Sequence, residues 1–188
     1  MYYLTVIKDH IRLAPRLFGV ELKDALLQMI KEKYDGFISR DFGVVIDVTK
    51  IQDIAEGVII PGDGAAFYET TFEVVNFKPE MHEVLMGKVR DIAEFGLFLN
   101  MGAMEGMVYI SQAMDDYVSY SKEKTISGKD SKKMLKVGDD CRSRVIAVSF
   151  KDIANPKLGL TMRQPGLGKL EWLEVSQKVE KSDKKEEK

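Results

Sequence analysis

The stretch GKVRDIAEFGLFLNMGAMEGMVYIS, residues 87–111, decides the fold of the second half of the chain. It reads as a strand, a bend at Gly96, a second strand, a turn through residues 102–106 and a third strand, because glycine is the usual residue where a chain turns sharply. Phe95 and Phe98 stand three positions apart across that bend. Rings placed in this way can share one surface, on which nucleic-acid bases stack.

Further strands are predicted on both sides of this stretch. β-Branched and aromatic residues bounded by glycine predict strands at residues 84–92, 96–100, 107–110, 142–150 and 158–163. Residues 111–134, which are rich in lysine and serine, are predicted to form an extended, solvated connection. Five strands with a long link after the third are typical of a small Greek-key barrel. We expect this barrel over residues 81–165, followed at residues 166–188 by a short helix and a charged tail.

The first 80 residues carry a different pattern, that of a small α+β unit. A strand is predicted at residues 2–7, and a helix at residues 20–34, where apolar positions recur at spacings of three and four. Two longer strands, at residues 42–60 and 67–77, flank the sequence PGDG at residues 61–64. Proline and glycine in this order are a strong turn signal, and by themselves they indicate only a hairpin turn.

Charge differs between the two halves. The chain has 28 lysines and arginines against 30 aspartates and glutamates, a formal net charge of −2, which argues against a protein that simply coats nucleic acid. Residues 1–80 carry 9 basic and 13 acidic side chains, whereas residues 81–168 carry 13 and 11, so the halves are expected to have different partners. The candidates for phosphate contacts, which position RNA without reading its sequence, are Lys88, Arg90, Arg142 and Arg144.

Composition excludes several classes of function. Cys141 is the only cysteine, so no internal disulfide framework can form and a reducing compartment is expected. Only two histidines are present, His10 and His82, which makes a metal site of the usual His/Cys composition unexpected. The sequence shows no phosphate-cradling glycine loop, nucleophile elbow, signal peptide or membrane-spanning apolar run. We therefore predict a cytoplasmic protein without catalytic residues, metal or cofactor, and with no membrane partner.

The barrel segment resembles the RNA-binding domain named after ribosomal protein S-one, which is an OB-fold barrel. The shared pattern is G-x-V, a spacer, F-G-x-F and then G-x-x-G-hydrophobic-V-aromatic-x-S, and the resemblance covers about residues 82–163. It implies that Phe95, Phe98 and Tyr109 face RNA. Together with the basic residues of the segment, the predicted RNA-binding set is Lys88, Arg90, Phe95, Phe98, Tyr109, Arg142, Arg144, Lys157 and Arg163.

The segment departs from that family at three positions. Tyr109 stands where many members have histidine, Ser149 stands where many have aspartate, and Lys157 lies near a usual arginine after a few extra residues. The stacking surface is retained, because tyrosine still offers a ring. Since the polar contacts are not all retained, we expect loose RNA binding and not strict sequence readout.

Nearly the whole chain is similar to one family, the seventh subunit, or E-prime, of archaeal DNA-directed RNA polymerase. The similarity rests on residues 2–15, the single helix, the hairpin at residues 58–79 and the tail PGLGKLEW at residues 165–172. It implies a truncated ribonucleoprotein-like α+β domain whose tip plugs into the polymerase core, with Pro61, Gly62, Asp63 and Gly64 at that tip. It also implies a heterodimer with a small helical protein of the polymerase, its fourth subunit (F), and a non-catalytic stalk that contacts single-stranded nascent RNA.

Some features keep a second interpretation. Phe95 and Phe98 can both be ordinary barrel core, and the lysines of residues 122–136 suit a solvated loop better than a dedicated RNA site. The methionines of residues 101–107 and Met114 suit either a partner surface or core packing. At the level of function, the rivals are a free-standing RNA-binding module in translation or RNA decay, and a structural adaptor whose barrel contacts only protein.

Overall fold

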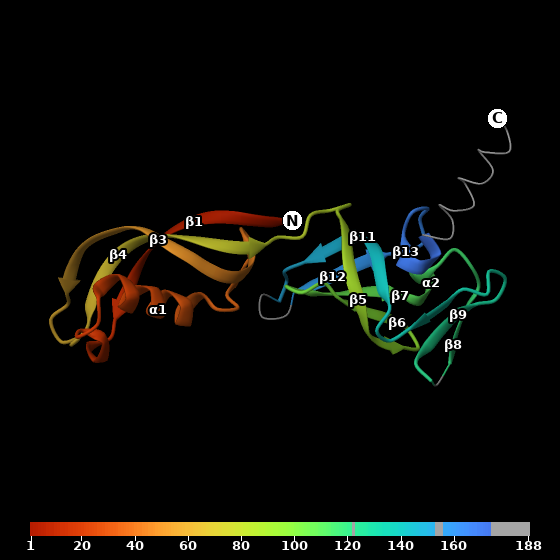
Figure 1. Ribbon diagram of the computed structural model, residues 1–188, viewed down its shortest axis with the longest axis horizontal. Coiled ribbons are helices and arrows are strands. Elements are labelled where there is room, and N and C mark those ends of the chain that lie inside the picture. Colours follow the sequence, from red (N-terminus) through yellow and green to blue (C-terminus); the bar gives the residue numbers. More distant parts are fainter. Residues whose placement is uncertain (122, 153–155, 174–188) are drawn as a thin grey trace, which may run out of the picture. The chain divides into compact units, whose positions relative to one another are not determined.

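The chain forms two compact units, Met1–Lys78 (unit 1) and Pro79–Lys188 (unit 2), in the computed structural model (Figure 1). The structure describes residues 1–121, 123–152 and 156–173. Within these residues no helix is both long enough and apolar enough to cross a membrane. Each unit has its own hydrophobic core, so the two are described separately.

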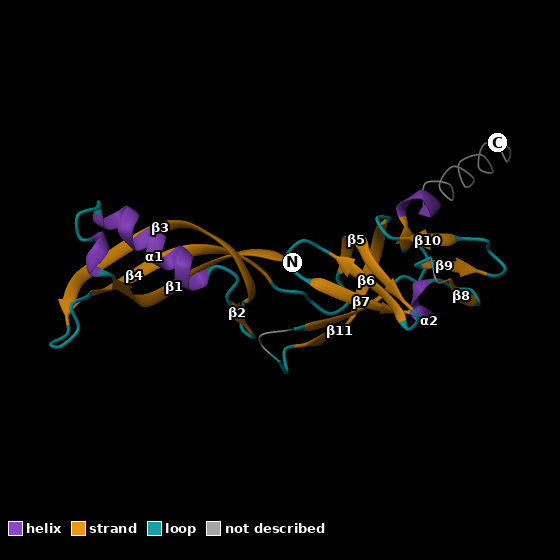
Figure 2. Cartoon of the chain, turned by 90° about the horizontal axis from the view of Figure 1, so that it is seen from below, coloured by secondary structure: helices purple, strands orange, loops and turns teal. Residues whose placement is uncertain are grey.

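Unit 1 is a four-stranded antiparallel sheet with one α-helix. The strand order is β1-β4-β3-β2, and the bounds are β1 Tyr2–Leu13, β2 Ile38–Ser39, β3 Gly43–Ile59 and β4 Ala66–Phe77. A short 3-10 helix, Pro15–Leu17, leads from β1 to α1, Leu22–Tyr34. Figure 2 shows α1 lying across one face of the sheet. The predicted α+β class is confirmed, although β1 extends six residues beyond the predicted strand.

The apolar spacing of α1 explains how the helix packs. Its buried residues include Leu26 and Ile30, four positions apart and therefore on one face of the helix. They pack in one cluster with Ile11 and Leu13 of β1 and Phe72 of β4, all almost completely buried. Ile11 and Leu13 are two residues apart in β1, so their side chains share the face that packs against α1. These apolar positions extend β1 to Leu13, and the strand ends just before Pro15.

Unit 2 contains a closed five-stranded barrel, as predicted. Its strands are β5 Val84–Ala93, β6 Gly96–Asn100, β7 Glu105–Tyr109, β11 Asp140–Ser149 and β12 Lys157–Thr161. They follow the order β12-β7-β6-β5-β11, and a further pairing between β11 and β12 closes the barrel. β12 runs parallel to β7, whereas the other neighbours are antiparallel. A two-residue strand, β13 Gly168–Lys169, pairs with Cys141 and Arg142 of β11, outside the stretch of β11 that pairs with β12.

The link after the third barrel strand is structured, so the prediction of an extended connection over residues 111–134 was wrong. A short helix, α2 Ile110–Ala113, precedes an antiparallel sheet of β8 Val118–Ser121, β9 Thr125–Gly128 and β10 Met134–Lys136. Ile126 and Leu135 are completely buried in the barrel core. Lysines and serines occupy the exposed positions between such residues and hide the alternation, which is why the composition looked like a loop.

The chain turns once more after the barrel. Residues 170–173 are helical, at the start of the predicted C-terminal helix. The predicted charged tail lies outside the described residues.

Candidate nucleic-acid interface

Three of the predicted RNA-binding residues share the outer face of β6 and β7. Gly96 of β6 is opposite Tyr109 of β7, and Phe98 is opposite Met107. Residues directly opposite each other in an antiparallel pair have side chains on the same face. The side chains of Phe98, Met107 and Tyr109 are therefore on one side of the sheet, and Phe95 precedes β6 at its edge. We call Phe95, Phe98, Met107 and Tyr109 the aromatic face.

The rings of this face are accessible from solvent. Phe95 is 54% exposed and Tyr109 is 56% exposed, whereas Phe98 is half-buried. The Phe95 and Phe98 rings meet edge to face, with 6.1 Å between centroids and an interplanar angle of 85°. The interpretation of both phenylalanines as core is therefore wrong for Phe95. Sequence reasoning missed Met107 as a member of the face, although its alternation with Tyr109 was a usable signal.

Gly96 is required for the close approach of β6 and β7 at this face. A Cβ atom built at Gly96 would lie 2.2 Å from the Val108 carbonyl oxygen and 3.0 Å from the Cα atom of Tyr109. Any side chain at this position would push the strands apart. The glycine in the F-G-x-F pattern thus lets Phe95 and Tyr109 come together across the two strands.

The cations beside the aromatic face are matched by carboxylates. Lys88 Nζ lies 3.8 Å from Asp140 Oδ1, and Arg90 forms an ion pair with Glu105. Lys124 Nζ lies 2.7 Å from Asp91 Oδ1, and this hydrogen bond lowers the pKa of Asp91. The sequence did not identify Lys124 or these carboxylate partners. The paired residues are far apart in the chain, and only the register between strands brings them together.

Three of the remaining basic residues of the predicted set, Arg142, Arg144 and Arg163, lie away from the aromatic face. Arg144 donates from Nη1 to Gln164 Oε1 at 2.6 Å, and Arg163 donates from Nε to Asp115 Oδ1 at 2.8 Å. Arg142 and Arg163 line a separate cavity of about 520 Å³. Lys157 is exposed at the first position of β12. The structure thus divides the predicted RNA-binding residues between at least two places on unit 2.

The predicted tip residues form the turn between β3 and β4 in unit 1. Asp63 is held by Arg12 of β1 through two hydrogen bonds, Nε to Oδ2 at 3.0 Å and Nη2 to Oδ1 at 2.7 Å, and the Arg12 guanidinium lowers the pKa of Asp63. Three exposed apolar residues precede the turn: Val58, Ile59 and Ile60, which are 61%, 71% and 48% exposed. The sequence reading did not identify this apolar group.

Several other candidate residues have structural roles. Met101, Met104 and Met114 are buried, so the core interpretation is right for them. Cys141 is completely buried, and burial raises the pKa of its thiol to about 12, which keeps it protonated and a poor nucleophile.

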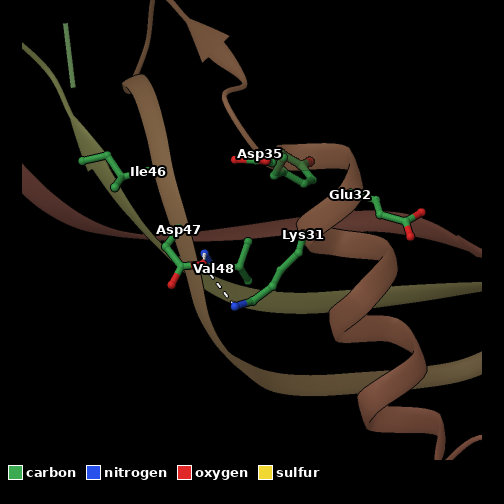
Figure 3. A pocket seen from close by; sticks show the side chains of 7 residues that line it. Lys31, Glu32, Asp35, Ile46, Asp47 and Val48 are labelled. Atoms are coloured by element: carbon green, nitrogen blue, oxygen red, sulfur yellow. Dashed lines mark hydrogen bonds and ion pairs between the residues drawn. The ribbon is translucent and has the colours of Figure 1, made fainter. Parts of the chain in front are cut away.

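A cavity of about 340 Å³ lies in unit 1 between α1 and β3 (Figure 3). Lys31 Nζ lies 3.2 Å from Asp47 Oδ1 in its wall, and Glu32 and Asp35 also line it. Because the single lysine of the wall is already paired and the other charges are negative, this cavity is poorly suited to an anion.

Comparisons with known proteins agree with this division into two units. Residues 8–64 match the "SHS2 domain found in N terminus of Rpb7p/Rpc25p/MJ0397", and residues 78–154 match the "S1 RNA binding domain". The chain therefore combines an SHS2 domain of the Rpb7p/Rpc25p/MJ0397 type with an S1 RNA binding domain.

Full-length relatives specify the class further. DNA-directed RNA polymerase subunit Rpo7 of Saccharolobus solfataricus is 37% identical over 95% of this chain and 100% of the relative. The Rpo7 subunit of Sulfolobus acidocaldarius is 34% identical over 98% and 100%. Bovine DNA-directed RNA polymerase III subunit RPC8 is 24% identical over 92% and 98%. The chain belongs to the Rpo7 family, whose members are accessory polymerase subunits and not themselves catalytic.

Proposed function

We propose that this chain is a stalk subunit that binds emerging single-stranded RNA on the aromatic face of unit 2. It docks on the polymerase core through Pro61, Gly62, Asp63 and Gly64, pairs with the small helical protein that is the fourth subunit (F) of the polymerase, and acts in the cytoplasm. RNA binding assists initiation and elongation by guiding the transcript. The observation that carries this proposal is the pair of solvent-exposed rings, Phe95 and Tyr109, on an S1 domain.

Stacking suits these rings better than hydrogen-bonded sequence readout. A base has an apolar face, and stacking on an aromatic side chain contributes about 1–3 kcal/mol per base whatever the base is. Phe95 and Tyr109 offer such rings in solvent, whereas the neighbouring Lys88 and Arg90 are already paired with carboxylates. The expected binding is therefore tolerant of sequence.

The tip of unit 1 supports the docking proposal. A turn that exposes Val58, Ile59 and Ile60 presents apolar surface which a partner can bury. The double hydrogen bond between Arg12 and Asp63 fixes the turn before docking, which reduces the conformational entropy lost on binding.

The face of the unit 1 sheet opposite α1 supports pairing with a helical subunit. Tyr2, Leu4 and Val6 alternate along β1 and are 59%, 66% and 53% exposed. Strand residues two apart share a face, and an amphipathic helix is a suitable cover for an apolar sheet surface.

An RNA titration with the full-length chain tests the central proposal. We expect Phe95→Ala and Tyr109→Ala each to weaken binding of a 12-nucleotide oligouridylate by about tenfold, since a tenfold change corresponds to about 1.4 kcal/mol. Tyr117→Ala is the matched control, because Tyr117 is an exposed aromatic residue of unit 2 outside the aromatic face. Equal binding by wild type and both face variants would refute the assignment and favour the structural adaptor.

Purification of the tagged chain with its partners separates the stalk proposal from the free-standing module. Recovery of polymerase core subunits together with a small helical subunit supports the proposal. Recovery of ribosomes or exosome subunits without polymerase would reject it.

A further inference from the structure

Unit 2 has a second surface with the chemistry of an anion site, the cavity of about 520 Å³ that Arg142 and Arg163 line. Its wall also includes Lys133, Gln164 and Trp172. We call it the basic pocket. These residues come from the link between β9 and β10, from β11 and from the segment after β12, so the barrel closure brings together parts of the chain that are far apart in sequence.

The charge of the basic pocket is positive. Lys133, Arg142 and Arg163 face one carboxylate, Asp115, which already accepts a hydrogen bond from Arg163 Nε at 2.8 Å. The side chain of Arg142 is partly buried, and it has no hydrogen-bond or ion-pair partner among the residues that the structure describes. A local excess of cations in a chain of net charge −2 favours an anionic ligand.

Two of the donors in the pocket wall are held in place. Arg144 Nη1 donates to Gln164 Oε1 at 2.6 Å, which leaves the amide group of Gln164 as a donor. Asp115 orients the guanidinium of Arg163 and occupies only its Nε. Guanidinium and amide N–H groups arranged around one cavity suit the several acceptor oxygens of a phosphate group.

The basic pocket is at the same end of the barrel as Tyr109. β12 runs parallel to β7 with Leu160 level with Val108, and Met162 N donates to Gln112 O at 2.8 Å. Tyr109 ends β7, and Arg163 follows β12 by two residues. With strands about 4.8 Å apart and a rise of about 3.3 Å per residue, an extended chain places the two Cα atoms about 8 Å apart. A short length of RNA bridges that span.

We propose that the basic pocket binds a phosphate of the RNA backbone, so that a strand stacked on the aromatic face continues past Tyr109 and places a phosphate among Lys133, Arg142 and Arg163. This inference rests on the proposed RNA binding by the aromatic face. It adds a second, chemically different contact, which lengthens the RNA footprint on unit 2.

Trp172 allows the pocket to be observed directly, because it is the only tryptophan in the chain and lies in the pocket wall. Unlabelled oligouridylates of 4 and 12 nucleotides are titrated into the full-length chain while Trp172 fluorescence is recorded. Anisotropy of labelled versions of the same oligomers measures total binding. The test variant is Arg142→Gln with Arg163→Gln, and the charge-matched control is Lys129→Gln with Lys136→Gln, two exposed residues outside the pocket wall.

We expect the 12-mer to bind wild type tighter than the 4-mer and to change Trp172 fluorescence. Loss of the two guanidinium contacts to that phosphate should weaken binding of the 12-mer by about fivefold to tenfold at moderate salt, remove the fluorescence change and leave 4-mer binding within twofold. The control variant should behave as wild type. Trp172 fluorescence in the absence of RNA verifies that the variants are folded.

Three results would overturn the inference. If RNA binds by anisotropy and Trp172 does not respond, the pocket is not part of the RNA path, while the proposed function stands. If the control variant loses as much affinity as the pocket variant, the effect is general electrostatics. If wild type binds neither oligomer, the proposed function fails and the pocket proposal fails with it.

Discussion

A hydrogen bond between α1 and β1 gives a quantitative test of how unit 1 is held together. Tyr34 Oη donates to Asp9 Oδ2 at 2.7 Å, and Lys33 Nζ forms an ion pair with the same carboxylate. The Tyr34 ring packs edge-on against Phe72 with 5.0 Å between centroids. Tyr34→Phe keeps that ring and removes only the hydroxyl group, so the change isolates one hydrogen bond.

The expected cost follows from the surroundings of Asp9. A hydrogen bond to a charged group contributes about 1.5–3 kcal/mol. The Asp9 side chain is 29% exposed and keeps its ion pair with Lys33, which places the loss at the low end of that range. We therefore expect Tyr34→Phe to lower the free energy of unfolding of unit 1 by about 1.5 kcal/mol at neutral pH.

The hydrogen bond between Tyr34 and Asp9 joins two titratable groups, so the stability lost in Tyr34→Phe depends on pH on both sides of neutrality. Burial opposes ionisation of Asp9, but hydrogen bonds from Lys33 and Tyr34 outweigh it and lower the pKa of Asp9 from 3.8. This stabilisation is present above pH 4 or so and is lost as the pH falls further. Burial, and then the hydrogen bond to Asp9, raise the pKa of Tyr34 above its usual 10. The stabilisation from the protonated Tyr34 hydroxyl is therefore present below about pH 10 and is lost above it.

Urea denaturation at pH 3, 7 and 10.5 tests this reasoning. Far-ultraviolet circular dichroism follows α1, and Trp172 fluorescence follows unit 2 in the same samples. The difference between wild type and Tyr34→Phe should be largest at pH 7 and smaller at both extremes, with the Trp172 transition unchanged. Tyr117→Phe is the control, since Tyr117 is 79% exposed. A difference of equal size at all three pH values would refute the assigned hydrogen bond.

Three further perturbations test other parts of the fold. Gly62→Ala places a Cβ atom at a φ of +94°, which should cost unit 1 about 1–2 kcal/mol in urea denaturation, whereas Gly62→Asn should cost less because asparagine tolerates left-handed backbone; equal costs would contradict this. Leu99→Ala removes a completely buried barrel side chain and should lower the stability of unit 2, measured by Trp172 fluorescence, by about 3 kcal/mol; a loss below about 1 kcal/mol would show that the barrel is not packed there. Asp116 accepts hydrogen bonds from the Ser131 hydroxyl and amide, which lower its pKa to about 2. Ionised Asp116 should therefore hold the loop after β9 in place above pH 4 and release it toward pH 2. Asp116→Ala at pH 7 should raise amide exchange in that loop by about tenfold. Unchanged exchange would show that Asp116 does not order the loop.

Local sequence features predicted the strands whose partners are close in the chain. Short turns at residues 94–95 and 101–104 join β5, β6 and β7, and Gly96 indicates that β6 and β7 approach closely. The strands within residues 111–134 were missed because exposed polar residues dominate the composition there, while few positions, such as Ile126 and the following Leu135, are buried. The barrel core receives these two side chains from outside its five strands, and a local pattern does not contain that information.

The candidate site shows the same limit. Phe95, Phe98 and Tyr109 were predicted from a short motif, and the pairing of β6 with β7 keeps them together. Arg142 and Arg163 were assigned to the same set, yet they meet each other at a cavity formed by segments joined only when β11 pairs with β12. Net charge by segment reports how many cations are present, but not which carboxylate neutralises each one.

The aromatic face and the basic pocket of unit 2 differ in how far carboxylates neutralise their cations. Beside the aromatic face, Lys88 and Arg90 already have the carboxylates of Asp140 and Glu105 as partners. A phosphate that approaches them competes with a carboxylate for each cation, so it gains less electrostatic free energy than at an unpaired cation, and stacking on the rings supplies most of the affinity. Stacking releases few counterions and depends weakly on salt.

In the basic pocket the balance is reversed, because the Arg142 side chain has no acidic partner among the described residues. Asp115, paired with Arg163, is the one carboxylate that lines the pocket, and Lys133 Nζ lies over the Trp172 ring. Each phosphate neutralised on a single strand contributes about −0.7 to the slope of log affinity against log salt. We therefore expect Phe95→Ala to lower RNA affinity while leaving this slope nearly unchanged. Arg142→Gln with Arg163→Gln should flatten the slope by about 0.7, the contribution of the one phosphate held in the pocket. If the slopes of these two variants responded in the opposite way, the division of labour between stacking and phosphate binding would be wrong.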